Sequence, residues 1–220
     1  MKATPAISAL FVALLMTATL GISPAVQASE LSTQANIFMF PQPQQVAEML
    51  LKNPSGKTVS LKEYRGRVVL LHFWSISCPA CKYEEPFLDE LKRTFGPKGL
   101  AVLGVNLIDP PKSVVSHASA RRLPFSVLFD GGRGFRIQSV PIAGKNSAFV
   151  INPANEAILN IPALPTTYIL DCRGSAVGYS IGAARWNHRS AVRLIQGLLA
   201  ESRTCPPPGP AQPQRVSSLW

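Results

Sequence analysis

Two cysteines separated by two residues, Cys78 and Cys81, constrain this chain more than any other feature. They follow a continuous apolar run, Val68–Trp74, which has the length of a buried strand, and they precede a helical pattern. Cys78 is therefore expected at the N-terminus of a helix, where unpaired backbone N–H groups and the helix dipole favour a thiolate. Pro79 suits the first helical position because it lacks an N–H that would have no partner there. Cys81 lies one turn later and can close a disulfide, so the sequence predicts a redox-active dithiol.

A structural disulfide, a metal site and a pair of buried thiols are the alternatives to redox chemistry. A loop across one helical turn restrains the unfolded chain little, which disfavours a purely structural bond. A zinc site needs a second closely spaced pair, whereas Cys172 and Cys205 lie far apart in the sequence. Copper(I), which soft thiolates favour, stays open as a cargo bound without turnover. Thiol–disulfide exchange is the leading prediction, with no metal and no cofactor beyond the Cys78–Cys81 disulfide.

The N-terminus has the pattern of a secretory signal. Lys2 precedes an apolar stretch over residues 6–22, and small residues end at Ala28 before Ser29. Residues 1–28 are therefore predicted to be a signal peptide. The alternative is an uncleaved anchor, although the stretch is shorter than the about 20 residues of a spanning helix. Either form places the rest of the chain outside the cytoplasm, where disulfides persist, with membrane association expected only through the N-terminus.

The chain is basic, with 22 Lys and Arg against 12 Asp and Glu and a formal net charge of +10. The basic residues are dispersed rather than gathered in a run, and nucleic acid is not an expected partner in this compartment. Attraction to an anionic membrane surface or to an acidic partner is one interpretation, and a merely soluble basic surface is the other. The length suits one domain with a full core.

The remaining patterns predict an α/β fold, with a mixed central sheet flanked by helices. The turn Asn53-Pro54-Ser55-Gly56 predicts an N-terminal β-hairpin. Further strands are expected over 68–74, 100–107, 125–129, 166–170 and 176–181, and helices over 81–95, 113–122 and around 191–199. Residues 29–45 are predicted to be a lead-in or tether, 46–204 the domain, and 205–220 a proline-rich, disordered tail.

Two separated motifs carry a family resemblance. Residues 56–61 and 64–71, followed by the pattern C-P-A-C-x-x-E-x-P, resemble the TlpA/ResA-like thioredoxin-fold thiol–disulfide oxidoreductases. Residues 164–171, L-P-T-T-Y-I-L-D, are similar to that family's second signature. The resemblance covers most of residues 53–202. It implies a thioredoxin fold with an N-terminal hairpin, in the periplasm or at the outer face of the bacterial inner membrane.

The resemblance also implies a cis bond between Leu164 and Pro165. The strand edge beside Cys78 would then be open for pairing with a substrate peptide. The ordinary alternative is a trans proline at the start of a strand. The candidate substrate-binding residues are Leu164, Pro165 and Thr166, together with Trp74, Pro79 and Ala80 beside the cysteines.

Glu84 occupies the position of the family's acidic residue, three residues after Cys81 on the same helical face. A partly buried carboxylate there would oppose thiolate formation and relay a proton to or from Cys81. The alternative is an exposed glutamate like its neighbour Glu85.

The resemblance favours a reductant, in which Cys78 attacks a partner-protein disulfide and Cys81 resolves the mixed disulfide. It implies a membrane thiol-reducing system as electron donor, with cytochrome c maturation partners or copper-site cysteines as clients. An oxidase or isomerase is the same chemistry at another potential and stays open. A redox-inactive interaction module is the remaining alternative.

The chain departs from the family at two places. Ser77 stands where the family usually has tryptophan, which leaves the site more open or differently walled. Extra chain enters at about residues 131–152, where residues 135–140 and 147–151 flank a turn and predict a β-hairpin, with a short helix over 155–161. This insertion either overhangs the active site and selects the partner or decorates the surface.

The second cysteine pair has a predicted structural role. Cys172 lies in the turn between the last two strands, and Cys205 lies just past the last helix. The strand after Cys172 rises about 20 Å, and the last helix returns about the same distance, so the two thiols should meet. A structural Cys172–Cys205 disulfide is therefore expected.

Overall fold

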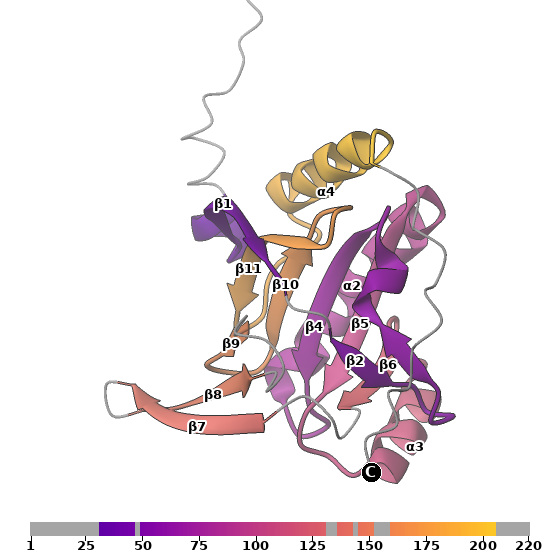
Figure 1. Cartoon of the computed structure of the whole chain (residues 1–220), viewed down its shortest axis with the longest axis vertical. Helices are drawn as coiled ribbons and strands as arrows, with labels where there is room; N and C mark the ends of the chain where they lie inside the picture. Colours follow the sequence, from indigo (N-terminus) through magenta and orange to yellow (C-terminus); the bar gives the residue numbers. More distant parts are fainter. Residues whose placement is uncertain (1–30, 47–48, 131–135, 143–144, 152–158, 206–220) are drawn as a thin grey trace, which may run out of the picture.

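The computed structural model describes residues 31–46, 49–130, 136–142, 145–151 and 159–205 (Figure 1). Its centre is an eight-stranded mixed sheet in the order β1-β11-β10-β4-β5-β6-β2-β3. The strands are β1 (Phe38–Gln45), β2 (Leu50–Lys52), β3 (Thr58–Ser60), β4 (Val68–Trp74), β5 (Leu100–Asn106), β6 (Ser126–Asp130), β10 (Thr166–Leu170) and β11 (Ser175–Ile181). The helices are α2 (Pro79–Phe95), α3 (Pro111–Arg121) and α4 (Arg189–Ser202), with short helical turns η1 (Leu31–Ala35), η2 (Leu61–Tyr64) and η3 (Gly96–Lys98).

Strand β4 lies in the middle of the sheet and carries the chain to the cysteines. All seven of its residues are buried, as are all seven of β5, which pairs with it in parallel. Such unbroken apolar runs are typical of strands covered on both faces. Strand β10 pairs antiparallel with β4 on the other side, and β2 pairs with β3 in the predicted N-terminal hairpin. The predicted mixed sheet flanked by helices is therefore confirmed.

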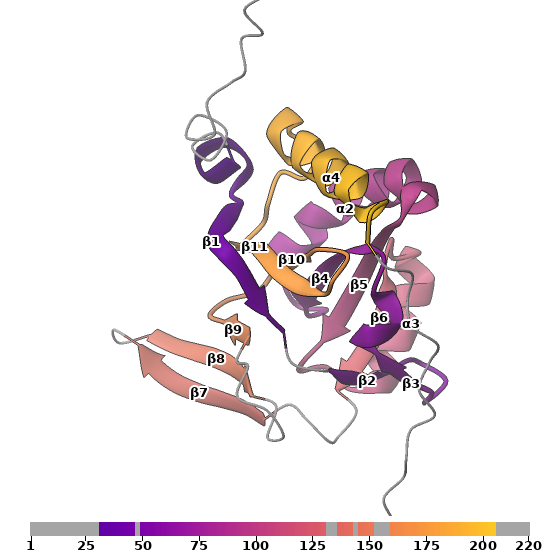
Figure 2. The ribbon, with the colours of Figure 1, turned by 45° about the horizontal axis from the view of Figure 1, so that its top comes forward.

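Alternate residues of β4 enter two separate cores. Trp74 and its even-numbered neighbours pack in the core that includes Leu88 of α2, Val114 of α3 and Ile195 of α4. Odd-numbered residues such as Phe73 pack in the other core. The three α-helices of the described chain thus contribute to one face of the sheet, and Figure 2 shows α2 and α4 together there. None of the described helices has the length and apolar character needed to cross a membrane.

The predicted tether over residues 29–45 is wrong for the part that the structure describes. Strand β1 pairs antiparallel with β11, and Leu31 lies buried in the helical core. This strand was not predicted because Pro41 and Pro43 interrupt the alternation of apolar and polar residues that identifies a strand. They are tolerated since β1 is an edge strand whose register shifts between Met39 and Gln44. The predicted signal peptide, residues 1–28, and the tail after Cys205 lie outside the described residues.

The insertion forms a second, three-stranded sheet in the order β7-β8-β9. Strands β7 (Arg136–Ile142) and β8 (Lys145–Ile151) pair antiparallel, which confirms the predicted hairpin, and they extend beyond the central sheet (Figure 1). The predicted helix over 155–161 is wrong at its end, since Leu159–Ile161 forms strand β9. Alternation explains the difference, because Leu159 and Ile161 both point into the second core while β9 pairs with β8. Residues 152–158 lie outside the described chain.

Candidate active site

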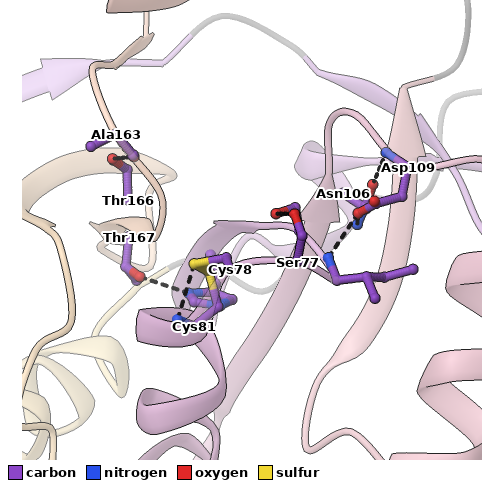
Figure 3. The surroundings of a disulfide bond; sticks show 11 residues. Ser77, Cys78, Cys81, Asn106, Asp109, Ala163, Thr166 and Thr167 are labelled. Atoms are coloured by element: carbon purple, nitrogen blue, oxygen red, sulfur yellow. Dashed lines mark hydrogen bonds between the residues drawn. A yellow bond between two sulfur atoms is a disulfide. The ribbon is translucent and has the colours of Figure 1, made fainter.

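The cysteine pair lies at the N-terminus of α2, as predicted. Cys78 is the N-cap residue, with extended backbone dihedrals, and Pro79 follows at the start of the helix. The Sγ of Cys78 accepts a hydrogen bond of 3.1 Å from the backbone N–H of Cys81 (Figure 3). The two cysteines form a disulfide with a Cα–Cα distance of 5.3 Å. Cys78 is 9% exposed and Cys81 only 1%, so a partner sulfur reaches Cys78 first.

The strand that begins after Pro165 lies beside this disulfide. The Leu164–Pro165 peptide bond is cis, which is the isomer that the resemblance implies. Thr166 pairs with Phe73 near the end of β4, and its hydroxyl donates to the Ala163 carbonyl at 2.7 Å. Figure 3 shows Ala163, Thr166 and Thr167 on one side of the disulfide. The predicted substrate edge and the dithiol thus lie at the same end of the sheet.

The candidate substrate-binding residues differ in accessibility. Pro79 is exposed, and Ala80 and Leu164 are half-buried. Trp74 is only 1% exposed and packs on Phe125, with ring centroids 5.3 Å apart. The assignment of Trp74 to substrate contact is therefore wrong, because the alternation of β4 places its ring in the core beneath the helices.

Glu84 is completely buried in the second turn of α2. The indole Nε1–H of Trp186 donates to its Oε1, across 102 residues of sequence, and the Ala184 backbone also bonds the carboxyl group. Burial raises the pKa of Glu84 to about 8, against the opposing effect of these two hydrogen bonds. At neutral pH the carboxyl group is largely protonated. The alternative of an exposed helix glutamate is wrong, and even Glu85 is buried, with an ion pair of 3.0 Å to Arg121.

A carboxylate that sequence reasoning missed holds the loop before Cys78. Asp109 Oδ2 accepts hydrogen bonds from the Ile76 backbone N–H at 2.8 Å and from Asn106 Nδ2 at 2.9 Å (Figure 3). The Asp109 backbone N–H donates in turn to Asn106 Oδ1. The loop after β5 therefore fixes the loop after β4, on the side of the disulfide opposite Thr166. The polar residues at the carboxyl ends of two neighbouring parallel strands were the available signal.

His72 is a second residue that no sequence spacing singles out. It is fully buried in β4, and its Nδ1 lies 2.9 Å from the hydroxyl of Thr167, two residues after Pro165. Its Nε2 has no hydrogen-bond partner in the structure. Burial lowers the pKa of His72 to about 3, so the ring is neutral at neutral pH. His72 therefore joins the core strand to the strand of Pro165 without adding charge.

The second cysteine pair lies at the other end of the sheet. Cys172 and Cys205 are disulfide-bonded, with a Cα–Cα distance of 6.2 Å, between the β10–β11 turn and the end of α4. The Cys172 carbonyl also accepts a hydrogen bond of 2.7 Å from Gly66 before β4. Within the described residues, no group of three or more His, Cys, Asp or Glu side chains could hold a metal ion.

A family model described as the AhpC/TSA family matches residues 43–175, which is more than half of the chain. The chain belongs to the AhpC/TSA family. The matched residues include both cysteines of the dithiol. The predicted enzyme class, an oxidoreductase, is confirmed by the names of the relatives.

Two curated relatives agree with this assignment. The thioredoxin-like protein YneN of Bacillus subtilis (strain 168) is 32% identical over 142 residues, which cover 63% of this chain and 71% of YneN. The thiol-disulfide oxidoreductase ResA of Geobacillus kaustophilus (strain HTA426) is 28% identical over 127 residues. That match covers 58% of this chain and 62% of ResA, less than two thirds of the relative's length. The predicted resemblance to ResA-like proteins is thereby confirmed.

A solved structure supports the fold. A thiol:disulfide interchange protein of the thioredoxin family, from Chlorobium tepidum TLS, has a TM-score of 0.54 at 17% sequence identity. The match covers 73% of this chain and 99% of that chain. The prediction of a thioredoxin fold is confirmed at this level.

Proposed function

We propose that this protein is an extracytoplasmic thiol–disulfide oxidoreductase that reduces disulfides in partner proteins. The observation that carries the proposal is the placement of Cys78 at the start of α2, bonded to the more deeply buried Cys81 and beside the strand of Pro165. The name of ResA as a thiol-disulfide oxidoreductase supports the same reaction. The reaction needs no cofactor beyond the Cys78–Cys81 disulfide.

The reduced protein reacts in two exchange steps. The Cys78 thiolate attacks one sulfur of a partner disulfide, forms a mixed disulfide, and releases the other partner sulfur as a thiolate that takes a proton. The Cys81 thiol then loses its proton and attacks the Sγ of Cys78, which releases the second partner sulfur. Two electrons pass to the partner, and the Cys78–Cys81 disulfide is formed.

Two groups near this pair have distinct roles in the proposed reaction. Glu84 lies one turn beyond Cys81 on the same face of α2, and its carboxylate form, the minor form at neutral pH, accepts the proton that Cys81 must lose. Leu164, half-buried before the cis bond to Pro165, offers its backbone to the partner beside Cys78, whereas Thr166 is fully buried and pairs with both β4 and β11. Pro79 and Ala80 border the attacking sulfur from the helix side.

The compartment and the electron source complete the proposal. The secretory pattern of residues 1–28 supports export to the periplasm or to the outer face of the inner membrane, where a membrane thiol-reducing system would return the protein to its dithiol form. Cytochrome c maturation partners and copper-site cysteines are the proposed clients. In this proposal the hairpin β7–β8, which precedes the strand of Pro165 in the sequence, selects among them.

The reduction potential of the Cys78–Cys81 couple tests the direction of electron flow, with Cys172–Cys205 left oxidised. A reductant is expected to equilibrate at or below about −250 mV, near thioredoxin. A value near about −120 mV would make the protein a disulfide donor and overturn the proposed direction. A Cys78→Ser variant, which cannot form the mixed disulfide, is the matched control for the reductase assay.

A further inference from the structure

The three α-helices begin at the dithiol end of the molecule, and each has a cation among its first four residues. Lys82 is the fourth residue of α2, Lys112 the second of α3 and Arg189 the first of α4. None of these helices has an acidic residue in its first turn. A cation at a helix N-terminus opposes the helix dipole, so this arrangement is unfavourable for each helix by itself. Its repetition in three helices indicates a use for positive charge at this end.

A fourth cation lies between the Pro165 strand and α2. The Gly182 backbone N–H donates to the Pro165 carbonyl at 2.8 Å, and Trp186 hydrogen-bonds the carboxyl group of Glu84. Residues 182–188 therefore border the active site, and Arg185 in this segment is exposed. Lys82, Lys112 and Arg189 are exposed as well.

Acidic side chains do not balance these cations. Among those that the structure describes, Glu84 and Glu85 are buried near the dithiol, so half-buried Asp109, which accepts from the Ile76 backbone, is set against four exposed cations. The more exposed acids lie farther away, at Glu63, Asp89, Glu90 and Glu201. Asp89 is the eleventh residue of α2, about 15 Å along the helix from its start.

We infer that the dithiol face docks partner proteins whose disulfide lies among acidic residues. The inference rests on the proposed thiol–disulfide exchange and adds the chemical class of the substrate surface. Arg185, Arg189, Lys82 and Lys112, reinforced by three helix N-termini, attract a negatively charged segment to Cys78. Clefts and faces of one charge sign raise association rates in a way that added salt suppresses.

The test uses three peptides that share one disulfide, flanked by Asp and Glu, by neutral residues, or by Lys. The rate constant for reaction with the fully reduced protein is measured at low and high salt. We expect the acidic peptide to react about tenfold faster than the neutral one at low salt and the basic peptide to react more slowly still. High salt should bring the three rate constants together. Equal rate constants at low salt would overturn the docking inference.

A double charge reversal, Arg185→Glu with Arg189→Glu, locates the effect. It should remove the preference for the acidic peptide, and the first-turn glutamate should leave α4 at least as stable, since it suits the helix dipole. The matched control is Lys57→Glu with Lys92→Glu, which changes the net charge equally at exposed positions away from the dithiol. A loss of preference in the control as large as that in the first variant would show that only net charge matters and would reject the docking face.

Reaction with 2,2′-dithiodipyridine, a small neutral disulfide, separates the two proposals. The rate constant for each peptide is divided by that for this compound, so that a change in thiol reactivity caused by the reversed charges cancels and only the effect on docking remains. If the unaltered protein reduced neither this compound nor any peptide, the proposed function itself would fail. Normal reduction of the compound with no discrimination among the peptides would reject the docking inference alone.

Discussion

The two disulfides of this chain lie at opposite ends of one sheet and at opposite ends of helices. Cys78–Cys81 spans the first turn of α2, whereas Cys172–Cys205 joins a strand turn to the end of α4 over a sequence separation of 33. The positive end of a helix dipole favours a thiolate at the first pair, and the second pair lies at the negative end of α4. Both are ordinary disulfides, so the difference between the predicted redox role and the predicted structural role must come from their surroundings.

The surroundings differ most in their buried titratable groups. Glu84 and His72, both fully buried, lie on the dithiol side of the molecule, and each has a displaced pKa. Near Cys172, the carboxyl group of Asp171 accepts hydrogen bonds from the backbone N–H groups of Arg173 and Ser175, which stabilise the turn. Both buried groups with a displaced pKa thus lie at the dithiol end of the sheet, whereas the other end fixes the end of α4 to the β10–β11 turn.

Cysteine substitutions are the largest test of this contrast. Cys78→Ser should lower disulfide reductase activity to background, because no other cysteine is placed to attack. Cys172→Ala with Cys205→Ala should leave the rate within about twofold but lower the free energy of unfolding by roughly 3–4 kcal/mol, as expected for a loop of this length. Turnover of a peptide disulfide and urea unfolding measure the two effects. A double variant that lost activity while still folded would break the division of roles.

Glu84→Gln should remove a dependence of stability on pH. The folded state keeps the carboxyl proton up to a pKa of about 8, whereas the unfolded chain releases it near 4.5. Between these values the native state binds more protons at Glu84, so the contribution of Glu84 to stability falls as pH rises, by at most about 1.4 kcal/mol per pH unit. Urea unfolding of the oxidised protein at pH 5 and pH 8 measures the difference.

The glutamine variant keeps an oxygen acceptor for Trp186 and should lack this loss of stability, so the stability gap between it and the unaltered protein should change steadily from pH 5 to pH 8. Glu85→Gln is the control, since Glu85 is ion-paired with Arg121 and should leave the slope in place. The pH profile of the rate with the peptide disulfide should shift only in the Glu84 variant. Parallel stability curves for the unaltered protein and Glu84→Gln would contradict the assigned titration.

Local patterns in the sequence predicted much of the dithiol end. Three continuous segments made this possible: the Cys78–Cys81 spacing, the apolar run of β4 and the motif around Pro165. The pattern within each segment can be interpreted without knowing which distant residues it contacts. Contacts between distant segments could not be predicted from the sequence, such as the hydrogen bonds of Trp186 with Glu84 and of Ile76 with Asp109. The pairing of β1 with β11 also escaped prediction. Its prolines break the alternation that identifies a strand, and only its neighbour in space shows why they are tolerated.

His72→Asn should act on the acid side of the same stability curve. The unfolded chain binds a proton at this histidine below about pH 6.5, whereas burial lowers the pKa in the folded state to about 3. The contribution of His72 to stability therefore falls as pH decreases between these values, by up to about 1.4 kcal/mol per pH unit. Asparagine retains a hydrogen-bonding group for Thr167 and removes this loss. Urea unfolding should show that the variant gains stability relative to the unaltered protein from pH 6 to pH 4, and an equal stability gap at both pH values would mean that His72 accepts a proton while folded.

Asp109→Ala gives the smallest expected effect and asks whether the dithiol depends on the loop beside it. The substitution leaves the Ile76 N–H and the Asn106 amide without their acceptor. We expect the free energy of unfolding to fall by about 1 kcal/mol, because the loop is only partly buried and water replaces part of the interaction. The loop before Cys78 should then move more freely, and the rate with a peptide disulfide should fall by no more than about tenfold.

The control for Asp109 is a carboxylate that forms an ion pair away from the dithiol. Asp89 pairs with Arg93 on the exposed, distal part of α2, so Asp89→Ala should change stability by a few tenths of a kcal/mol and leave the rate unaltered. Asp109→Asn, which keeps one oxygen acceptor, should lie between alanine and the unaltered protein in rate. If Asp109→Ala lowered stability as expected but left the rate unchanged, the loop would serve only the fold. Catalytic placement of Cys78 would then depend on α2 and the strand of Pro165 alone.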